Sequence, residues 1–397
     1  MTTNPPASQS PHPAASTESP APGTGGSVRR VVIAGGGTAG HVFPGLSVVA
    51  RLGAAPLWIG SKGGMEEPLV ARAGLPFVGI DAGAVLGRNP LQLAVSGLNN
   101  LRGFRAARAA VAAFRPDVLL ATGGYVSVPA VLAAKSLGLP SALYLPDVEP
   151  GLAVRALSRV VDRIACTAAE SHRYLPPSKV VPTGYPVRAE LRAWAERADR
   201  RTAGRAALGL PPTGPVLLVM GGSRGALRIN RAVWAGLDAL VARAAVVHVT
   251  GRDWIGQAEA RRAELPTGER ERYRPIPFAH EELGAVFASA DLGLFRAGAS
   301  TLGELPAFGL PSVLVPGQFA AGHQRHNARY LADAGAAEIV DDRALDDGHT
   351  LTEALAGLLE APERLEAMAR AAHQLDRPDA AERIADLLRQ LARSDAR

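Results

Sequence analysis

A histidine and two glycine-rich turns are the residues of this sequence best suited to chemistry. The first turn covers residues 35–40 and is followed directly by His41, and the second covers residues 221–226. Each turn lies between an apolar run and a helix-like stretch, which predicts a strand, a tight turn and a helix N-terminus. Glycines let a backbone approach a ligand closely, and free N–H groups at a helix start favour a phosphate or a developing negative charge. The pattern therefore predicts a phosphorylated ligand.

His41 is the candidate general base. At a helix start the helix dipole disfavours an added positive charge, so we expect a neutral imidazole that can accept a proton near pH 7. The alternative is a histidine that only caps or packs the turn, and the spacing leaves both open. Neither role needs a metal ion, because the sequence has no H-E-x-x-H motif, no cysteine cluster and no close acidic and histidine spacing.

A carboxylate in the second half, Glu304, follows a third predicted helix start at residues 296–301. In this place it can accept two hydrogen bonds from the neighbouring hydroxyls of a ribose, which an apolar or cationic side chain cannot do. The alternative is a solvated glutamate on a helix surface, the usual environment of this residue type. The sequence leaves both open.

The first turn also fits the G-x-G-x-x-G pattern of dinucleotide-binding proteins. That fold needs an acidic residue roughly 20 positions further on, at the end of the second strand, to bind the ribose. Here the second strand is expected to end at residues 58–62, and the first carboxylate after the glycine turn is Glu66, which lies beyond this strand. We therefore do not expect NAD.

The elements that position these residues alternate between apolar runs and helix-like stretches, twice over. This rhythm predicts an α/β fold of two doubly wound domains with parallel sheets. The first sheet is expected at residues 31–34, 56–59, 77–80, 118–121, 142–145 and 164–167. The second is expected at residues 216–220, 246–250, 273–278, 292–295, 312–315 and 338–340.

The boundary between the domains is expected near residues 185–213. There the Arg-rich stretch 189–205 runs into glycines and prolines, a composition typical of a hinge and linker. We assign residues 29–187 to the first domain and residues 188–375 to the second. A last helix at about residues 376–395 is expected to pack back on the first domain.

The composition agrees with two domains, because 397 residues with 47% hydrophobic content can form more than one core. Residues 1–28 are rich in Pro, Ser, Thr, Ala and Gly and predict a disordered tail. Neither a signal peptide nor an apolar run of roughly 18 to 20 residues is found, so we expect a cytoplasmic chain, at most peripheral to a membrane. The single cysteine, Cys166, lies in an apolar run and is expected to be buried rather than nucleophilic.

The formal net charge of +6 raises nucleic acid or an anionic membrane as partners. Nucleic acid is not expected, because aromatic residues make up only 5% of the chain and are not interleaved with a basic segment. A membrane is considered for residues 85–108, where apolar residues precede Arg102, Arg105 and Arg108. Such a helix can lie on an anionic membrane. The alternative is an ordinary helix that packs on the first sheet.

Six short motifs in order make the chain similar to the MurG family. They are GGGTAGHVFPG from residue 35, GGY from 123, PVR from 186, GGSRGA from 221, RAGAST-x-x-E from 296 and HQ-x-x-NA from 323. The resemblance implies a GT-B fold, in which two Rossmann-like domains face a cleft. It also implies an inverting enzyme that needs no cofactor and moves GlcNAc from UDP-GlcNAc to the C4 hydroxyl of the muramyl sugar of lipid I. The product is lipid II for peptidoglycan, made at the cytoplasmic face of the membrane by a peripheral protein.

The resemblance implies roles for residues that match the family's motifs. On the donor side it implies Ser223 and Arg188 at the diphosphate, Ala279 beside the uracil, Ala299, Ser300, Thr301, Leu302 and Gly303 along the pocket, Glu304 on the ribose and Gln324 on the GlcNAc hydroxyls. On the acceptor side it implies a loop of Thr38, Ala39, Gly40 and His41.

Two departures from the family pattern bear on the acceptor. Ala39 replaces a glycine, and residues 144–147 read Tyr-Leu-Pro-Asp where many members have His-Glu-Gln-Asn. Asp147 takes the place of the asparagine and can only accept where an amide also donates, so it is an alternative base or the mark of a different acceptor. Two other functions therefore stay open: a UDP-sugar-dependent transferase for another lipid, and a non-catalytic UDP-sugar-binding scaffold.

Overall fold

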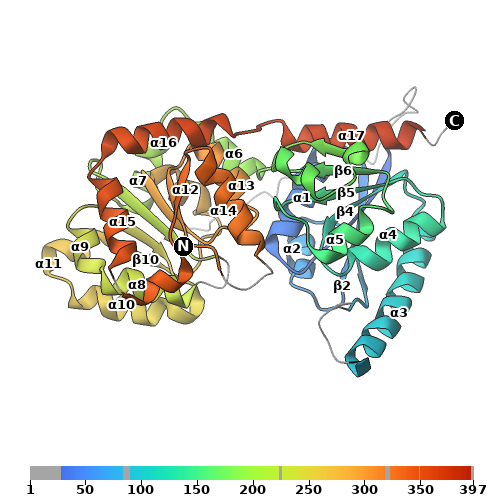
Figure 1. Ribbon diagram of the computed structural model, residues 1–397, viewed down its shortest axis with the longest axis horizontal. Coiled ribbons are helices and arrows are strands. Elements are labelled where there is room, and N and C mark those ends of the chain that lie inside the picture. Colours follow the sequence, from blue (N-terminus) through green and yellow to red (C-terminus); the bar gives the residue numbers. More distant parts are fainter. Residues whose placement is uncertain (1–27, 84–89, 223–225, 318–321, 348, 395–397) are drawn as a thin grey trace, which may run out of the picture.

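Two parallel sheets, each covered by helices, lie side by side in the computed structural model (Figure 1). The structure describes residues 28–83, 90–222, 226–317, 322–347 and 349–394. The tail predicted at residues 1–28 lies outside this range except for its last residue. The α/β fold with two doubly wound domains is confirmed.

The first domain has a seven-stranded sheet in the order β3-β2-β1-β4-β5-β6-β7. Its strands are β1 (Arg30–Gly35), β2 (Ala55–Ser61), β3 (Phe77–Ile80), β4 (Val118–Gly123), β5 (Ser141–Leu145), β6 (Arg163–Cys166) and β7 (Val180–Pro182). Its helices are α1 (Ala39–Leu52), α2 (Glu66–Arg72), α3 (Pro90–Phe114), α4 (Ser127–Ser136) and α5 (Leu152–Leu157), with 3₁₀ turns η1 (Ala169–Arg173) and η2 (Pro177–Lys179).

The second domain has a six-stranded sheet in the order β10-β9-β8-β11-β12-β13. Its strands are β8 (Val216–Met220), β9 (Ala245–Val249), β10 (Tyr273–Ile276), β11 (Leu292–Phe295), β12 (Ser312–Leu314) and β13 (Ala337–Ile339). Its helices are α6 (Ala189–Ala195), α7 (Arg200–Leu208), α8 (Leu227–Ala235), α9 (Leu237–Val241), α10 (Ile255–Glu264), α11 (Thr267–Arg270), α12 (Leu283–Ser289), α13 (Thr301–Phe308), α14 (His323–Asp333), α15 (Thr350–Leu359) and α16 (Pro362–Gln374). The 3₁₀ turns are η3 (Arg252–Trp254) and η4 (Asp342–Asp347), and a last helix is α17 (Ala380–Ser394).

Among the described residues all strand pairs are parallel, and the strand order reverses between β1 and β4 in one sheet and between β8 and β11 in the other. Strands β4, β5 and β9 are buried over their whole length, which explains their continuous apolar sequences. In open α/β sheets ligands bind beyond the carboxyl ends of the strands at such a reversal. The turn after β1 and the turn after β11 occupy these positions.

The Arg-rich stretch 189–205, which lies in the expected boundary region, is largely helical. This stretch forms α6 and α7, which pack on α12. Its arginines are structural: Arg205 pairs with Asp291 at 2.8 Å, and Arg192 binds Asp376 through two bonds of 2.6 and 2.8 Å. The chain passes from the first sheet to the second domain in residues 183–188, between β7 and α6.

The chain returns to the first domain at its end. In Figure 1 α16 lies on the second domain and α17 lies along the first. α17 packs on α1 and against β4, β5 and β6, and it buries Ile384 and Leu388. The two domains are therefore joined by two crossings of the chain.

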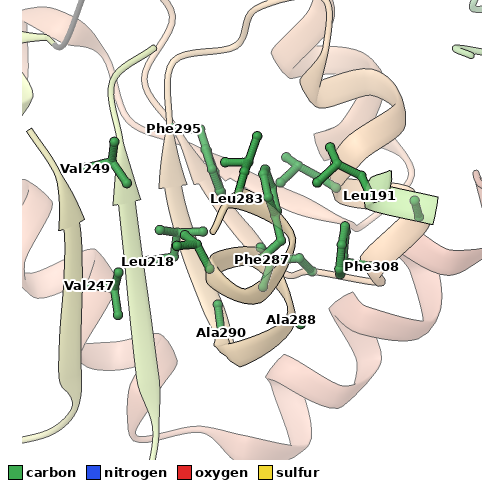
Figure 2. Close-up of a cluster of buried hydrophobic side chains, with 14 of the residues drawn as sticks. Leu191, Leu218, Val247, Val249, Leu283, Phe287, Ala288, Ala290, Phe295 and Phe308 are labelled. Carbon is green, nitrogen blue, oxygen red and sulfur yellow. The ribbon is translucent and has the colours of Figure 1, made fainter. Parts of the chain in front are cut away.

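The second domain's core supports α13, the helix that carries Glu304. Phe287 of α12 stacks on Phe295 of β11 and on Phe308 of α13, with ring centroids 5.8 and 5.2 Å apart (Figure 2). Phe295 is the last residue of β11, so this stack fixes both the end of the strand and the helix after it. The turn at residues 296–300 is held between two packed elements.

A buried polar chain crosses the other side of this domain. Trp234 Nε1 donates to the Tyr273 hydroxyl, which lies 3.0 Å from His248 Nδ1, and His248 Nε2 lies 3.0 Å from Asn230 Oδ1. Because the amide oxygen only accepts, the proton of a neutral His248 is on Nε2. Burial lowers the pKa of His248 to about 3, so this tautomer persists in the folded state.

We expect His248 to make the folded state acid-sensitive. Its pKa is lowered on folding, so between pH 6.5 and about 3 the unfolded chain binds a proton that the folded chain does not. The free energy of unfolding should thus fall by about 1 kcal/mol from His248 between pH 7 and pH 5.5. Urea unfolding at the two pH values measures this. A His248→Gln variant that keeps the full pH dependence would contradict it.

Candidate active site

The carboxyl-end loops of the two sheets approach each other. A Cβ placed on Gly40, in the first turn of α1, would lie 3.7 Å from the Cβ of Ala299, in the turn after β11. A Cβ on Gly151 would likewise lie 3.7 Å from His323 Nε2, at the start of α14. The predicted acceptor loop and the predicted donor turn are therefore neighbours.

His41 lies in the first turn of α1 and is half-buried. Its Nδ1 is 2.9 Å from the Gly36 carbonyl oxygen, which only accepts, so Nδ1 carries a proton. In a neutral ring Nε2 then has a free lone pair. A Cβ on Gly123 would lie 2.9 Å from Nε2, so the imidazole packs against this glycine where a side chain would clash with the ring. The ring packs against the turn and also presents a proton acceptor.

The first glycine turn is not a set of free donors. The Gly36 amide donates to the Gly123 carbonyl at 3.3 Å, and the Gly37 amide donates to Glu66 Oε2 at 3.1 Å. Trp58 Nε1 donates to the Gly35 carbonyl at 2.9 Å. The N–H groups of Gly36 and Gly37, which precede α1, are therefore paired within the first domain and are not available to a phosphate.

Glu304 is buried, with only 6% of its surface exposed, so the alternative of a solvated surface glutamate is wrong. Its Oε1 lies 3.3 Å from a guanidinium nitrogen of Arg188, and burial raises the pKa of its carboxyl while Arg188 opposes this shift. The Arg188 guanidinium also lies 4.1 Å from the ring centroid of Phe43 in α1, and its Nε is buried without a partner. Arg188 thus links the predicted ribose site to the helix that carries His41.

The remaining predicted donor residues come from the turn after β11, from α13 and α14, and from the segment after β10. Ser300 precedes α13, and the Thr301 hydroxyl donates to the Gly298 carbonyl at 2.6 Å. Ala279 and Leu302 are buried, and Gly303 lies against Tyr185, where a Cβ would come within 2.6 Å. Gln324 Oε1 accepts a bond from the Gly317 amide at 2.8 Å. Ser223 lies outside the described residues.

The predicted acceptor loop, residues 38–41, leads into helix α1 and forms its first turn. Thr38 precedes α1 in an extended conformation, and its hydroxyl makes no capping bond to the helix. Ala39 and Gly40 form the first turn and are half-buried, whereas Thr38 is exposed. The replacement of a glycine by Ala39 is therefore accommodated in ordinary helix.

Asp147 is bound to the second domain. Its Oδ1 accepts a bond of 2.7 Å from Asn327 Nδ2, which also donates to the Ala297 carbonyl, while Asn327 Oδ1 accepts from the Val148 amide. Tyr144, from the same departure from the family pattern, is fully buried with its hydroxyl 2.8 Å from Thr167 Oγ1. One Asp147 oxygen is thus occupied in a domain contact, whereas the Nε2 atom of His41 is not.

Two further observations bear on other kinds of site. Cys166 is buried, as expected, and burial raises the pKa of its thiol to about 12. Over the described ranges no group of three or more His, Cys, Asp or Glu side chains is arranged to hold a metal ion.

A pocket of about 670 Å³ between the domains is lined by Thr167, Tyr174, His326 and Tyr330 among others. None of the predicted site residues lines it.

Sequence reasoning missed three residues of this region. Glu66 is fully buried and accepts a hydrogen bond from the Gly37 amide. Asn327 is fully buried and accepts one from the Val148 amide. The ring of Phe43 lies against the Arg188 guanidinium. Phe43 lies in the GGGTAGHVFPG motif and Asn327 in the HQ-x-x-NA motif. The motifs therefore pointed to both residues, but the sequence did not indicate what either side chain does. For Glu66 the available signal was the pair of glycines at residues 63 and 64 just before it.

Comparisons with known proteins agree on one family. Residues 31–166 match the model of the glycosyltransferase family 28 N-terminal domain, and residues 216–384 match that of the family 28 C-terminal domain. The chain is 41% identical to the UDP-N-acetylglucosamine--N-acetylmuramyl-(pentapeptide) pyrophosphoryl-undecaprenol N-acetylglucosamine transferase of Roseiflexus sp., over 91% of this chain and 95% of that protein. It is 39% identical to the enzyme of the same name from Desulforudis audaxviator, over 91% and 98%. The crystal structure of Acinetobacter baumannii MurG is similar with a TM-score of 0.71 and 27% identity, over 91% and 99%.

Proposed function

The chain belongs to the MurG family of glycosyltransferases, and from this premise we propose that it transfers GlcNAc from UDP-GlcNAc to lipid I, giving lipid II for peptidoglycan. The observation that carries the proposal is the placement of His41, with a free Nε2, beside the turn that leads to Glu304 and Arg188. Together these residues supply a proton acceptor on one domain and polar groups for a sugar nucleotide on the other.

The proposed mechanism is a direct displacement with inversion. His41 Nε2 takes the proton of the muramyl C4 hydroxyl as its oxygen attacks the anomeric carbon of GlcNAc and the bond to UDP breaks. Negative charge then develops on the diphosphate. Arg188 and the N–H groups of the second glycine turn stabilise this charge, and no metal ion is required.

The donor is proposed to lie along the turn after β11. Glu304 would bind the ribose hydroxyls, Gln324 the GlcNAc hydroxyls and Ala279 the uracil, with residues 299–303 along the pocket. When the ribose binds, the Glu304 carboxylate would give up part of its contact with Arg188 to accept the ribose hydroxyls. The Arg188 guanidinium would then be free to bind the diphosphate. Support comes from the burial of Glu304 and the unpaired Nε of Arg188.

The test is UDP release and product mass with UDP-GlcNAc and a short-chain lipid I analogue, in the presence of EDTA. Transfer of one GlcNAc is the expected result. Transfer to diacylglycerol but not to lipid I would support the alternative lipid acceptor. Donor binding without transfer to any acceptor would support a scaffold. Loss of transfer on adding EDTA, restored by a divalent ion, would overturn the metal-free mechanism.

The chain is also proposed to dock on the cytoplasmic face of an anionic membrane through α3. Val95, Leu98 and Leu101 are 54%, 48% and 45% exposed, and Arg102, Arg105 and Arg108 follow them on exposed positions. The opposite face of α3 buries Ala107 and Val111 and packs on α4. One face of α3 therefore packs on the first domain, and its other face exposes apolar and basic side chains. Leu86, Leu91 and Leu93, in the same stretch, lie outside the residues whose side chains are described. Within the described chain, no helix has the length and apolar character of a membrane span.

We expect Leu98→Ser and Arg105→Ala each to weaken binding to phosphatidylglycerol vesicles about fivefold to tenfold, because each removes roughly 1 kcal/mol of apolar or electrostatic attraction. Vesicle co-sedimentation measures the change. Ile339→Ser is the control, since Ile339 is 41% exposed on the second domain. Equal binding by all variants would contradict docking through α3.

A further inference from the structure

A buried carboxylate, Glu66, stands directly behind the loop that carries His41. Glu66 is the first residue of α2 and has no exposed surface. Its Oε1 accepts a bond of 2.7 Å from the Ser61 amide, at the end of β2, and its Oε2 accepts one of 3.1 Å from the Gly37 amide. One side chain thus ties the end of a strand to the glycine turn before α1.

The glycines around Glu66 make this contact possible. A Cβ on Gly36 would lie 2.0 Å from Oε1, and a Cβ on Gly64 would lie 2.5 Å from the same atom. Neither distance is compatible with a side chain, so the carboxylate fills a space that only glycines leave open. The turn and the carboxylate are matched to each other.

The hydrogen bond of Glu66 is linked to His41 through one peptide group, that between Gly36 and Gly37. Glu66 holds the Gly37 amide, and the Gly36 carbonyl, on the other side of the same peptide bond, accepts the Nδ1 proton of His41 at 2.9 Å. The N–H and C=O of one peptide plane are therefore both engaged, one by Glu66 and one by His41. A rotation of this peptide would break both bonds.

We propose that Glu66 is a positioning residue for His41, which deepens the transfer reaction proposed above and rests on it. By fixing the peptide between Gly36 and Gly37, Glu66 keeps the carbonyl aimed at Nδ1, holds the proton on that nitrogen and leaves Nε2 as the acceptor. Glu66 itself does not touch the substrates. Its loss should leave the donor site intact and misplace the base, and small misplacements of a catalytic group are costly.

The test compares Glu66→Gln with Glu67→Gln. Glutamine keeps the shape of the side chain but turns an NH₂ group towards one of the two amides, whereas Glu67 is the exposed neighbour in the same helix. We expect Glu66→Gln to lower kcat about tenfold with the KM for UDP-GlcNAc within about twofold of the parent. Glu67→Gln should match the parent in both. An unchanged kcat, or a kcat and donor affinity that fall together, would overturn the proposal.

A second readout does not depend on activity. The ¹⁵N spectrum of the imidazole rings reports which nitrogen is protonated, and the His41 signals are those lost in the His41→Asn variant. We expect a dominant Nδ1–H form in the parent and a mixture in Glu66→Gln; the same form in both would overturn the proposal. If Glu66→Gln does not fold, Glu66→Asp, which keeps the charge but is one methylene shorter, is measured instead with the same expectations.

The two readouts separate the failure of this inference from that of the transfer reaction. If the parent transfers no sugar but the ring signals change in Glu66→Gln, the proposed function fails and the coupling of Glu66 to His41 stands. If the parent transfers and the variants differ in neither measurement, the inference alone fails.

Discussion

His41→Ala is expected to lower the turnover of GlcNAc transfer by about 10²- to 10⁴-fold, the range for loss of a general base. The structure gives His41 a proton on Nδ1, held by the Gly36 carbonyl, and a free lone pair on Nε2. Removing the ring removes the acceptor of the substrate's proton. The KM for UDP-GlcNAc should change little, because the proposed donor residues that lie on the second domain are untouched. Steady-state UDP release measures both.

The variant His41→Asn separates the base from the packing role. The asparagine amide can still donate to the Gly36 carbonyl but has no nitrogen that accepts a proton. We expect it to be as slow as His41→Ala, with His349→Ala, on an exposed position, at the parent's rate. Full turnover in His41→Asn would mean that the ring only packs the turn.

The alternative base, Asp147, is tested in the same assay. In Asp147→Asn the side-chain oxygen can still accept the bond from Asn327, so the domain contact is kept and the carboxylate is lost. If His41 is the base, turnover should stay within about tenfold of the parent. A loss of 10²-fold or more in Asp147→Asn, with little loss in His41→Ala, would transfer the role to Asp147.

The sheets could be predicted because continuous apolar runs mark strands covered on both faces. β3, β8 and β11 begin and end at the residues expected from the sequence. β7, at Val180–Pro182, was not predicted, because it has three residues of which only the first is buried. The turns after β1 and β11 lie where the strand order of each sheet reverses, and the sequence marks both by a glycine-containing motif directly after an apolar run.

Contacts between residues far apart in the sequence explain why the stretch 189–205 is packed and why Glu304 is buried. The stretch 189–205 is polar in sequence, but its arginines find carboxylates 86 and 184 residues away and so become part of a packed layer. Glu304 was as polar a candidate, yet it is buried because the stacked rings of the second core bring α13 against the segment with Arg188. No local pattern records such pairings.

Glu304→Ala is expected to weaken the binding of UDP about 10- to 100-fold, because hydrogen bonds to a charged group contribute roughly 1.5–3 kcal/mol and each 1.4 kcal/mol is tenfold. The burial that raises the pKa of this carboxyl also keeps water from competing for its oxygens once the ribose is bound. Isothermal titration with UDP measures the Kd. Glu353→Ala, an exposed glutamate in the first turn of α15, is the matched control.

A nucleotide without the 2′-hydroxyl makes the ribose assignment specific. The parent should bind UDP about tenfold more tightly than 2′-deoxy-UDP, since one of two hydrogen bonds to Glu304 is lost. In Glu304→Ala the two nucleotides should bind alike, because the partner of that hydroxyl is gone. If the variant loses affinity but still prefers UDP by the parent's ratio, Glu304 acts by holding Arg188 rather than by binding the ribose, and the ion pair at 3.3 Å is then its main role.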